Sequence, residues 1–121
     1  MLFRSMAFEH QISEYSGFKK FVWIGNLLEK NQIDAALQSA QQFVELGQNK
    51  WMVDLSQLQH LNSSGLNALI QLLTKARNAG GEAVLFGLNQ RTKDLLTMTK
   101  LHSIFTVVPS LEDAVEILSS K

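Results

Sequence analysis

The chain has 121 residues, of which 45% are hydrophobic and 18% are charged, a balance typical of one folded domain and not of a disordered or membrane-spanning chain. Eleven Lys and Arg residues balance eleven Asp and Glu residues, so no excess charge favours direct binding to nucleic acid or to an anionic membrane. The absence of cysteine excludes disulfides and thiolate chemistry and fits a reducing compartment, so we expect a cytoplasmic protein.

The chain begins with a short segment, residues 1–7, that precedes the first regular pattern. Its apolar stretch carries one basic residue and is too short for a signal peptide. Phe8–Tyr15 then alternates apolar and polar residues, and Phe18–Ile24 is rich in aromatic and β-branched residues, which predicts two strands joined by a turn at Ser16-Gly17. We therefore expect an N-terminal extension over residues 1–7 and one domain over residues 8–121.

The middle of the chain predicts a helix, a strand and a second helix. Apolar residues recur at helical spacing from Ile33 to Leu46, with Asn31 expected as the N-cap and Gly47 as the stop. The apolar run at residues 51–55 suits a buried central strand that ends near Asp54. Residues 66–79 form the clearest helical pattern, which the glycines at 80 and 81 end.

The last third predicts two further strands and two further helices. Residues 83–86 and 104–108 are strand-like, and residues 92–99 indicate a short helix between them. Ser110 follows a proline, and Asp113 stands three residues later in the spacing of a capping box, which marks the start of the final helix. This alternation predicts an α/β fold with a mixed, mainly parallel central sheet and about four helices.

The polar stretch from Ser56 to Gly65 joins a buried strand to the clearest helix and is the candidate functional segment. Ligands and partners of open α/β sheets gather at the carboxyl ends of the strands, where we expect this stretch as a loop. Helix capping alone explains Asn62 and Ser63. A phosphate on Ser63 is the competing interpretation, since the amides and dipole of a helix start tolerate negative charge.

Four segments, taken in order, resemble the STAS domain of bacterial anti-sigma factor antagonists. They are Asp54-Leu55-Ser56, Leu61-Asn62-Ser63-Ser64-Gly65-Leu66, Gly80-Gly81-Glu82 and the stretch at residues 101–107 before the final helix. The resemblance extends over roughly residues 8–118, and its specific part is the segment from residue 54 to residue 66. It implies the STAS fold and a protein-binding role without enzymatic activity, cofactor or metal.

The resemblance further implies a partner-switching role. The unphosphorylated domain would bind an anti-sigma factor that is also a serine kinase and so free a sigma factor, and a PPM-type serine phosphatase would reverse the phosphorylation. The acceptor position of the family maps onto Ser63, with Ser64 second. The expected partner-binding residues lie on the candidate segment, just after it and at the end of the second strand: Asn26, His60, Asn62, Ser63, Ser64, Gly65 and Asn67.

Two positions depart from the family pattern. Family members often carry Gly-x-Leu-Asp after the second strand, where this chain has Gly25-Asn26-Leu27-Leu28, and an acidic residue in place of Asn62. Both departures remove a carboxylate. They leave open an alternative, in which the chain is a STAS-like scaffold or accessory subunit of a transporter or signalling complex and never carries phosphate. The sequence does not specify the oligomeric state.

Other chemistries have weak support in the sequence. Asp54, His60 and Ser63 include the residue types of a hydrolase triad, but Gly-x-Ser-x-Gly is absent. The three histidines, at positions 10, 60 and 102, lack the close or helical pairing of metal ligands. Trp23 and Trp51 stand among apolar neighbours, so we expect them in the core.

Overall fold

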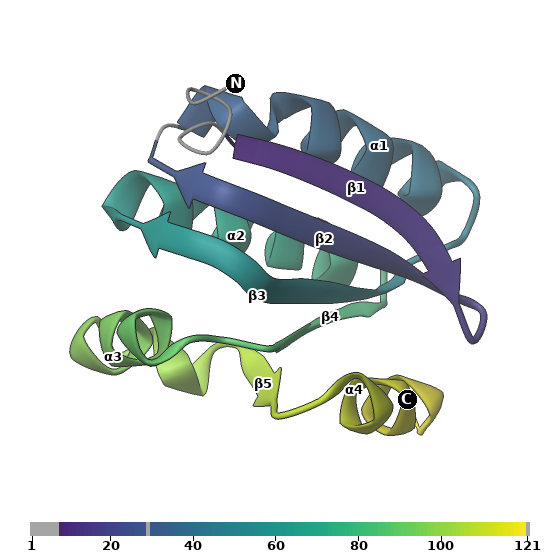
Figure 1. Ribbon diagram of the computed structural model, residues 1–121. Helices are drawn as coiled ribbons and strands as arrows, with labels where there is room; N and C mark the ends of the chain where they lie inside the picture. The colour runs from purple at the N-terminus through teal and green to yellow at the C-terminus, as the bar shows by residue number, and fades with distance from the viewer. Residues whose placement is uncertain (1–7, 29, 121) are drawn as a thin grey trace.

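The computed structural model describes residues 8–28 and 30–120. In this part, five strands form one sheet in the order β1-β2-β3-β4-β5 (Figure 1). β1 pairs antiparallel with β2, and the other neighbours are parallel. The strands are β1 (Phe8–Tyr15), β2 (Phe18–Leu27), β3 (Lys50–Leu61), β4 (Glu82–Phe86) and β5 (Thr106–Val108). The expected mixed, mainly parallel sheet is confirmed.

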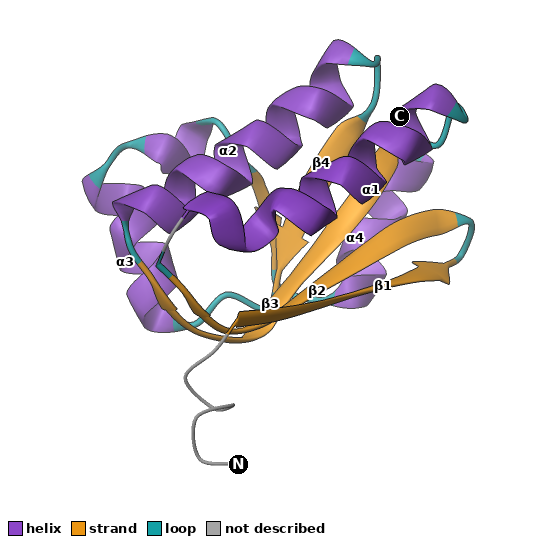
Figure 2. Cartoon of the chain, turned by 90° about the horizontal axis from the view of Figure 1, so that it is seen from above, coloured by secondary structure: helices purple, strands orange, loops and turns teal. Residues whose placement is uncertain are grey.

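Helices cover both faces of the sheet. α1 (Asp34–Glu45) and α2 (Ser63–Asn78) lie side by side on one face, and α4 (Leu111–Ser119) packs on the other (Figures 1 and 2). α3 (Gln90–Met98) follows β4 at the end of the sheet where β2 and β3 finish (Figure 1). None of the helices in residues 8–28 and 30–120 has the length and apolar character needed to cross a bilayer.

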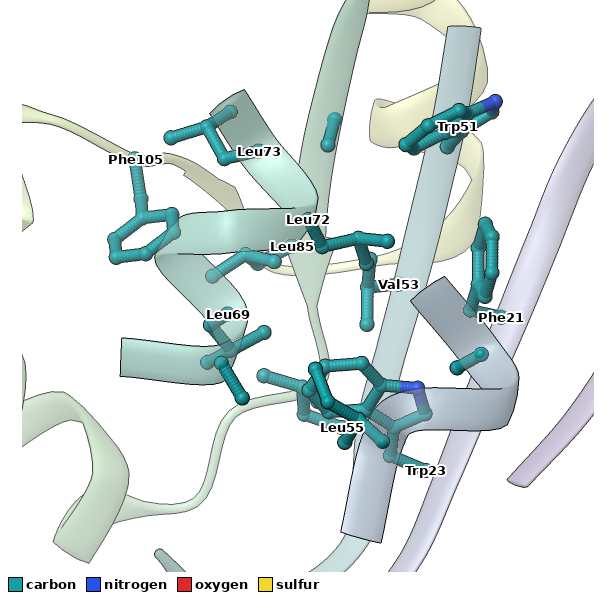
Figure 3. Close-up of a cluster of buried hydrophobic side chains, with 14 of the residues drawn as sticks. Phe21, Trp23, Trp51, Val53, Leu55, Leu69, Leu72, Leu73, Leu85 and Phe105 are labelled. Carbon is teal, nitrogen blue, oxygen red and sulfur yellow. The ribbon is translucent and has the colours of Figure 1, made fainter. Parts of the chain in front are cut away.

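The main core lies between the sheet and the two helices α1 and α2. Phe21 of β2 packs edge-on against Trp51 of β3 with ring centroids 5.5 Å apart, and the Trp51 indole Nε1 donates a hydrogen bond of 2.6 Å to the Gln48 carbonyl. Figure 3 shows these side chains and Trp23 in one cluster with Leu69, Leu72 and Leu73 of α2. Both tryptophans are fully buried, which confirms their expected place in the core. A smaller cluster beneath α4 buries the other face of β3 and β4.

β3 is longer than the sequence predicts. The stretch from Ser56 to Leu61, expected as a loop, continues the strand by pairing with β2, for example Leu58 with Gly25. β4 ends beside Asp54, so among the described residues only β2 pairs with this extension, and most of its side chains are exposed. Exposed polar side chains gave the segment its loop-like composition, and the expectation of a loop there was wrong.

Two other element starts also differ from the prediction, and a third agrees with it. Asn31 lies in a 3-10 turn (Lys30–Ile33) and does not cap α1, which begins at Asp34 without a side-chain cap. The last strand begins at Thr106 and not at Ile104, because residues 101–103 form a second 3-10 turn. Ser110 caps α4 as expected: its hydroxyl accepts from the Asp113 amide and donates to the Asp113 carboxylate.

Candidate partner-binding site

The candidate site is the end of the sheet where β2 and β3 finish and α2 and α3 begin. We call it the tip and define it as residues 26–28, 58–67 and 89–92. In parallel α/β sheets this end carries the strand carboxyl termini and the helix amino termini, which is where binding sites gather.

Asn62 is the residue that fixes α2 to the sheet. Its backbone is extended, and its side-chain Oδ1 accepts a hydrogen bond of 3.0 Å from the Gly65 amide, which confirms the predicted N-cap. Its Nδ2 donates a second bond of 3.0 Å to the Leu28 carbonyl at the end of β2. One side chain therefore starts the helix and also ties it to the neighbouring strand.

Gly65 brings the first turn of α2 into close contact with the strand ends. A Cβ built on Gly65 would lie 2.6 Å from Leu61 Cδ1 and 2.9 Å from Leu27 Cγ, and closest to the Leu27 carbonyl oxygen. Glycine is required there because the backbones approach closely. Since Gly65 is buried, it shapes the predicted partner surface without itself being accessible to a partner.

Ser63 and Ser64 occupy the first turn of α2 and are both exposed. Neither hydroxyl forms a hydrogen bond with any residue in the described part of the chain. The cap is made by Asn62, so capping requires neither serine. Asn67, one turn further along α2, is also exposed and extends the same surface.

The end of β2 forms the second side of the tip. Gln32 holds it in place, because its Oε1 accepts from the Leu28 amide at 2.8 Å and its Nε2 donates to the Asn26 carbonyl at 3.3 Å. Asn26 is only 7% exposed, so this predicted contact residue is buried at the end of β2 and is not itself part of the exposed surface. Leu28 is 43% exposed and presents an apolar side chain where family members often carry a carboxylate.

α3 supplies a part of the tip that the sequence did not indicate. Arg91 Nη1 lies 3.0 Å from Nδ1 of the exposed His60. Asn89 holds α3 in place as Asn62 holds α2: its Oδ1 accepts from the Thr92 amide at 2.8 Å and its Nδ2 donates to the Leu58 carbonyl at 3.1 Å. The sequence could have shown Asn89 as an N-cap, because it precedes a helical pattern. Nothing in the residues around Arg91 indicates that it lies beside His60.

Asp54 lies away from the other two residues of the triad alternative. Its carboxylate oxygen Oδ1 accepts hydrogen bonds from the Ser56 amide at 2.9 Å and the Ser56 hydroxyl at 2.7 Å. His60 stands six positions after Asp54 on the strand, which places them roughly 20 Å apart, so the structure does not bring the three residues together. Across residues 8–28 and 30–120, His, Asp and Glu side chains form no group suited to hold a metal ion.

Comparisons with known proteins agree with this architecture. Residues 24–114 match the model of the STAS domain family. BtrV of Bordetella bronchiseptica, whose name assigns it provisionally to the anti-sigma factor antagonists, is 30% identical over 89 residues, which cover 74% of each chain. The chain spans between 66% and 74% of the lengths of the curated relatives that it matches.

Solved structures show the same fold. An anti-sigma factor antagonist from Mycobacterium paratuberculosis superposes with a TM-score of 0.76 at 21% identity, covering 93% of this chain and 95% of the other. The unphosphorylated form of the antagonist SpoIIAA gives a TM-score of 0.72 at 10% identity, covering 93% of this chain and all of SpoIIAA. SpoIIAA from Bacillus has also been solved in its phosphorylated form.

Proposed function

Because this chain belongs to the STAS domain family, we propose that it is an anti-sigma factor antagonist that works as a phosphorylation-controlled partner switch. The unphosphorylated tip docks on an anti-sigma factor serine kinase, and the sigma factor held by that kinase is freed. Transfer of a phosphoryl group to Ser63 ends the complex. A PPM-type serine phosphatase removes the group and restores binding.

The exposed Ser63 hydroxyl is the observation that carries the proposal. Ser63 stands at the first position of α2, and Asn62 has already taken the capping role, so the hydroxyl is accessible and has no structural task. The existence of a phosphorylated form of SpoIIAA, which has the same fold, supports a phosphate on this scaffold. The names of the relatives support the antagonist role.

A phosphate on Ser63 would change the surface and leave the fold in place. The first intrahelical hydrogen bond of α2 is donated by the Leu66 amide to the Asn62 carbonyl, so the amides of residues 63 and 64 precede the helical ladder. These amides and the helix dipole favour an anion at this position. The phosphate also brings about −1.5 to −2 charges to the docking surface. We therefore expect lost binding without unfolding.

Phosphorylation with purified proteins tests the proposal. The chain is incubated with ATP and, one at a time, with the anti-sigma-type serine kinases of its source genome, and the modified residue is located by peptide mapping. We expect one phosphoryl group on Ser63, none in Ser63→Ala, and wild-type labelling in the matched control Ser64→Ala. Labelling that follows Ser64, or that persists in Ser63→Ala, contradicts the assignment.

A scaffold function is the second candidate, and the two missing carboxylates favour it. Asn62 and Leu28 leave this part of the tip without the acidic residues that the family pattern places there. A scaffold would bind its partner with the same affinity in the wild type, Ser63→Ala and Ser63→Glu. A switch would lose affinity in Ser63→Glu alone.

A further inference from the structure

The pair formed by His60 and Arg91 is a feature of the tip that capping and phosphorylation leave unexplained. Arg91 Nη1 can only donate, so the hydrogen bond of 3.0 Å to His60 Nδ1 requires the neutral imidazole as acceptor. Both residues are exposed, and Arg91 forms no ion pair within residues 8–28 and 30–120. The guanidinium thus has His60 as its hydrogen-bond partner at the surface and retains donors for another group.

Arg91 gives the residues of the tip one positive charge. With His60 neutral, Arg91 is the only formally charged residue of residues 26–28, 58–67 and 89–92. Asp94 borders the tip, because its carboxylate accepts from Gln90 Nε2 at 2.9 Å, and the adjacent Lys93 offsets its charge. Asp54 is separated from His60 by roughly 20 Å of strand. The two departures from the family pattern, both losses of a carboxylate, therefore leave a surface with one positive charge.

We propose that Arg91, positioned by His60, receives an acidic segment of the partner. The proposal rests on the proposed function, because it names the chemistry of the partner that docks on the same tip. An arginine held in place suits a carboxylate because its planar fork pairs with both oxygens. The uncharged amides and hydroxyls of Asn62, Ser63 and Asn67 suit polar neighbours of that carboxylate, and Leu28 suits one apolar side chain.

The same arrangement predicts that phosphorylation would oppose the binding of an acidic partner. A phosphoryl group on Ser63 would add about −1.5 to −2 charges to residues 26–28, 58–67 and 89–92, which together carry one positive charge, so their net charge would become negative. An acidic partner would then meet like charge in place of opposite charge. Charge complementarity acts mainly on partner choice and association rate, so this reversal would slow docking as well as weaken it.

Two short capped peptides, hexaglutamate and hexalysine, test the proposal without the kinase or the phosphate. Each is titrated into the ¹⁵N-labelled chain while amide chemical shifts are followed. We expect hexaglutamate to move the signals of residues 58–67 and 89–92 and hexalysine to leave them unchanged. Arg91→Gln should weaken the hexaglutamate effect by about threefold, the scale of one exposed ion pair. Lys93→Gln is the matched control, because Lys93 lines a separate hollow between α3 and β5.

His60 is tested as a positioning residue by two substitutions. His60→Ala should weaken hexaglutamate binding as Arg91→Gln does, whereas His60→Gln, whose amide oxygen still accepts from Arg91, should retain it. The proposal is overturned if hexaglutamate leaves the tip unmoved, if hexalysine acts equally there, or if Lys93→Gln costs as much as Arg91→Gln. Failure of Ser63 labelling would refute the switch while leaving this result unaffected, so the two failures are distinguishable.

Discussion

The two hydrogen bonds of Asn62 predict different costs for two substitutions at this one position. Asn62→Ala removes the helix cap, which is worth about 1 kcal/mol. It also removes the bond to the Leu28 carbonyl, worth up to about 1 kcal/mol because that residue is partly exposed. Asn62→Asp keeps the cap and gains about 0.3–1 kcal/mol from the helix dipole, but it loses the donor to Leu28. We expect the free energy of unfolding to fall by about 2 kcal/mol in Asn62→Ala and to change by less than about 0.5 kcal/mol in Asn62→Asp.

Urea unfolding followed by circular dichroism measures both variants. With a slope of about 2 kcal/mol per molar urea, Asn62→Ala should lower the midpoint by about 1 M and Asn62→Asp should leave it nearly unchanged. Equal losses in the two variants would show that the bond to Leu28, and not the cap, is the important one. A midpoint of Asn62→Ala within error of the wild type would refute the assigned role altogether.

Three further substitutions test other parts of the fold, each by its urea midpoint. Gly65→Ala should lower the free energy of unfolding by about 1–3 kcal/mol, because the added Cβ collides with the Leu27 carbonyl. An unchanged midpoint would contradict the close packing of Gly65 against Leu27. Arg77→Met should lower the free energy of unfolding by about 1–2 kcal/mol, because the Glu82 carboxylate, only 8% exposed, loses the Arg77 guanidinium that lies 2.9 Å from it. An unchanged midpoint would show that the fold does not need this ion pair. Ser110→Ala should lower the free energy of unfolding by about 1 kcal/mol by removing the α4 cap, and Ser110→Thr, which keeps the hydroxyl that donates to the Asp113 carboxylate, should restore most of it.

Most of the fold was predictable because each element carries a complete local signal. The alternation over residues 8–15 gives β1 with its observed bounds, and the apolar spacing after residue 66 gives α2. The second half of β3 was not predictable, because its pairing with β2 extends beyond β4 and leaves polar side chains exposed. Such a segment has no periodic apolar pattern, and only the position of its partner strand makes it a strand.

The site was predictable where its parts are adjacent in the sequence. Asn62 as cap and the first turn of α2 follow from the order of residues 61–66. The link from Asn62 to Leu28 and the pair of His60 with Arg91 join residues 34 and 31 positions apart. No local sequence pattern predicts contacts between residues so far apart. The place of Arg91 at the tip, and the positive charge that it brings, were therefore seen only in the structure.

The central claim is that Ser63 carries the regulatory phosphate, and peptide mapping of the protein isolated from its native cells tests it most directly. The account predicts a mixture of unmodified chain and chain phosphorylated on Ser63 alone, with proportions that change with growth condition. Phosphate confined to Ser64, or a chain that is never phosphorylated under any condition in which its relatives switch, would contradict the account.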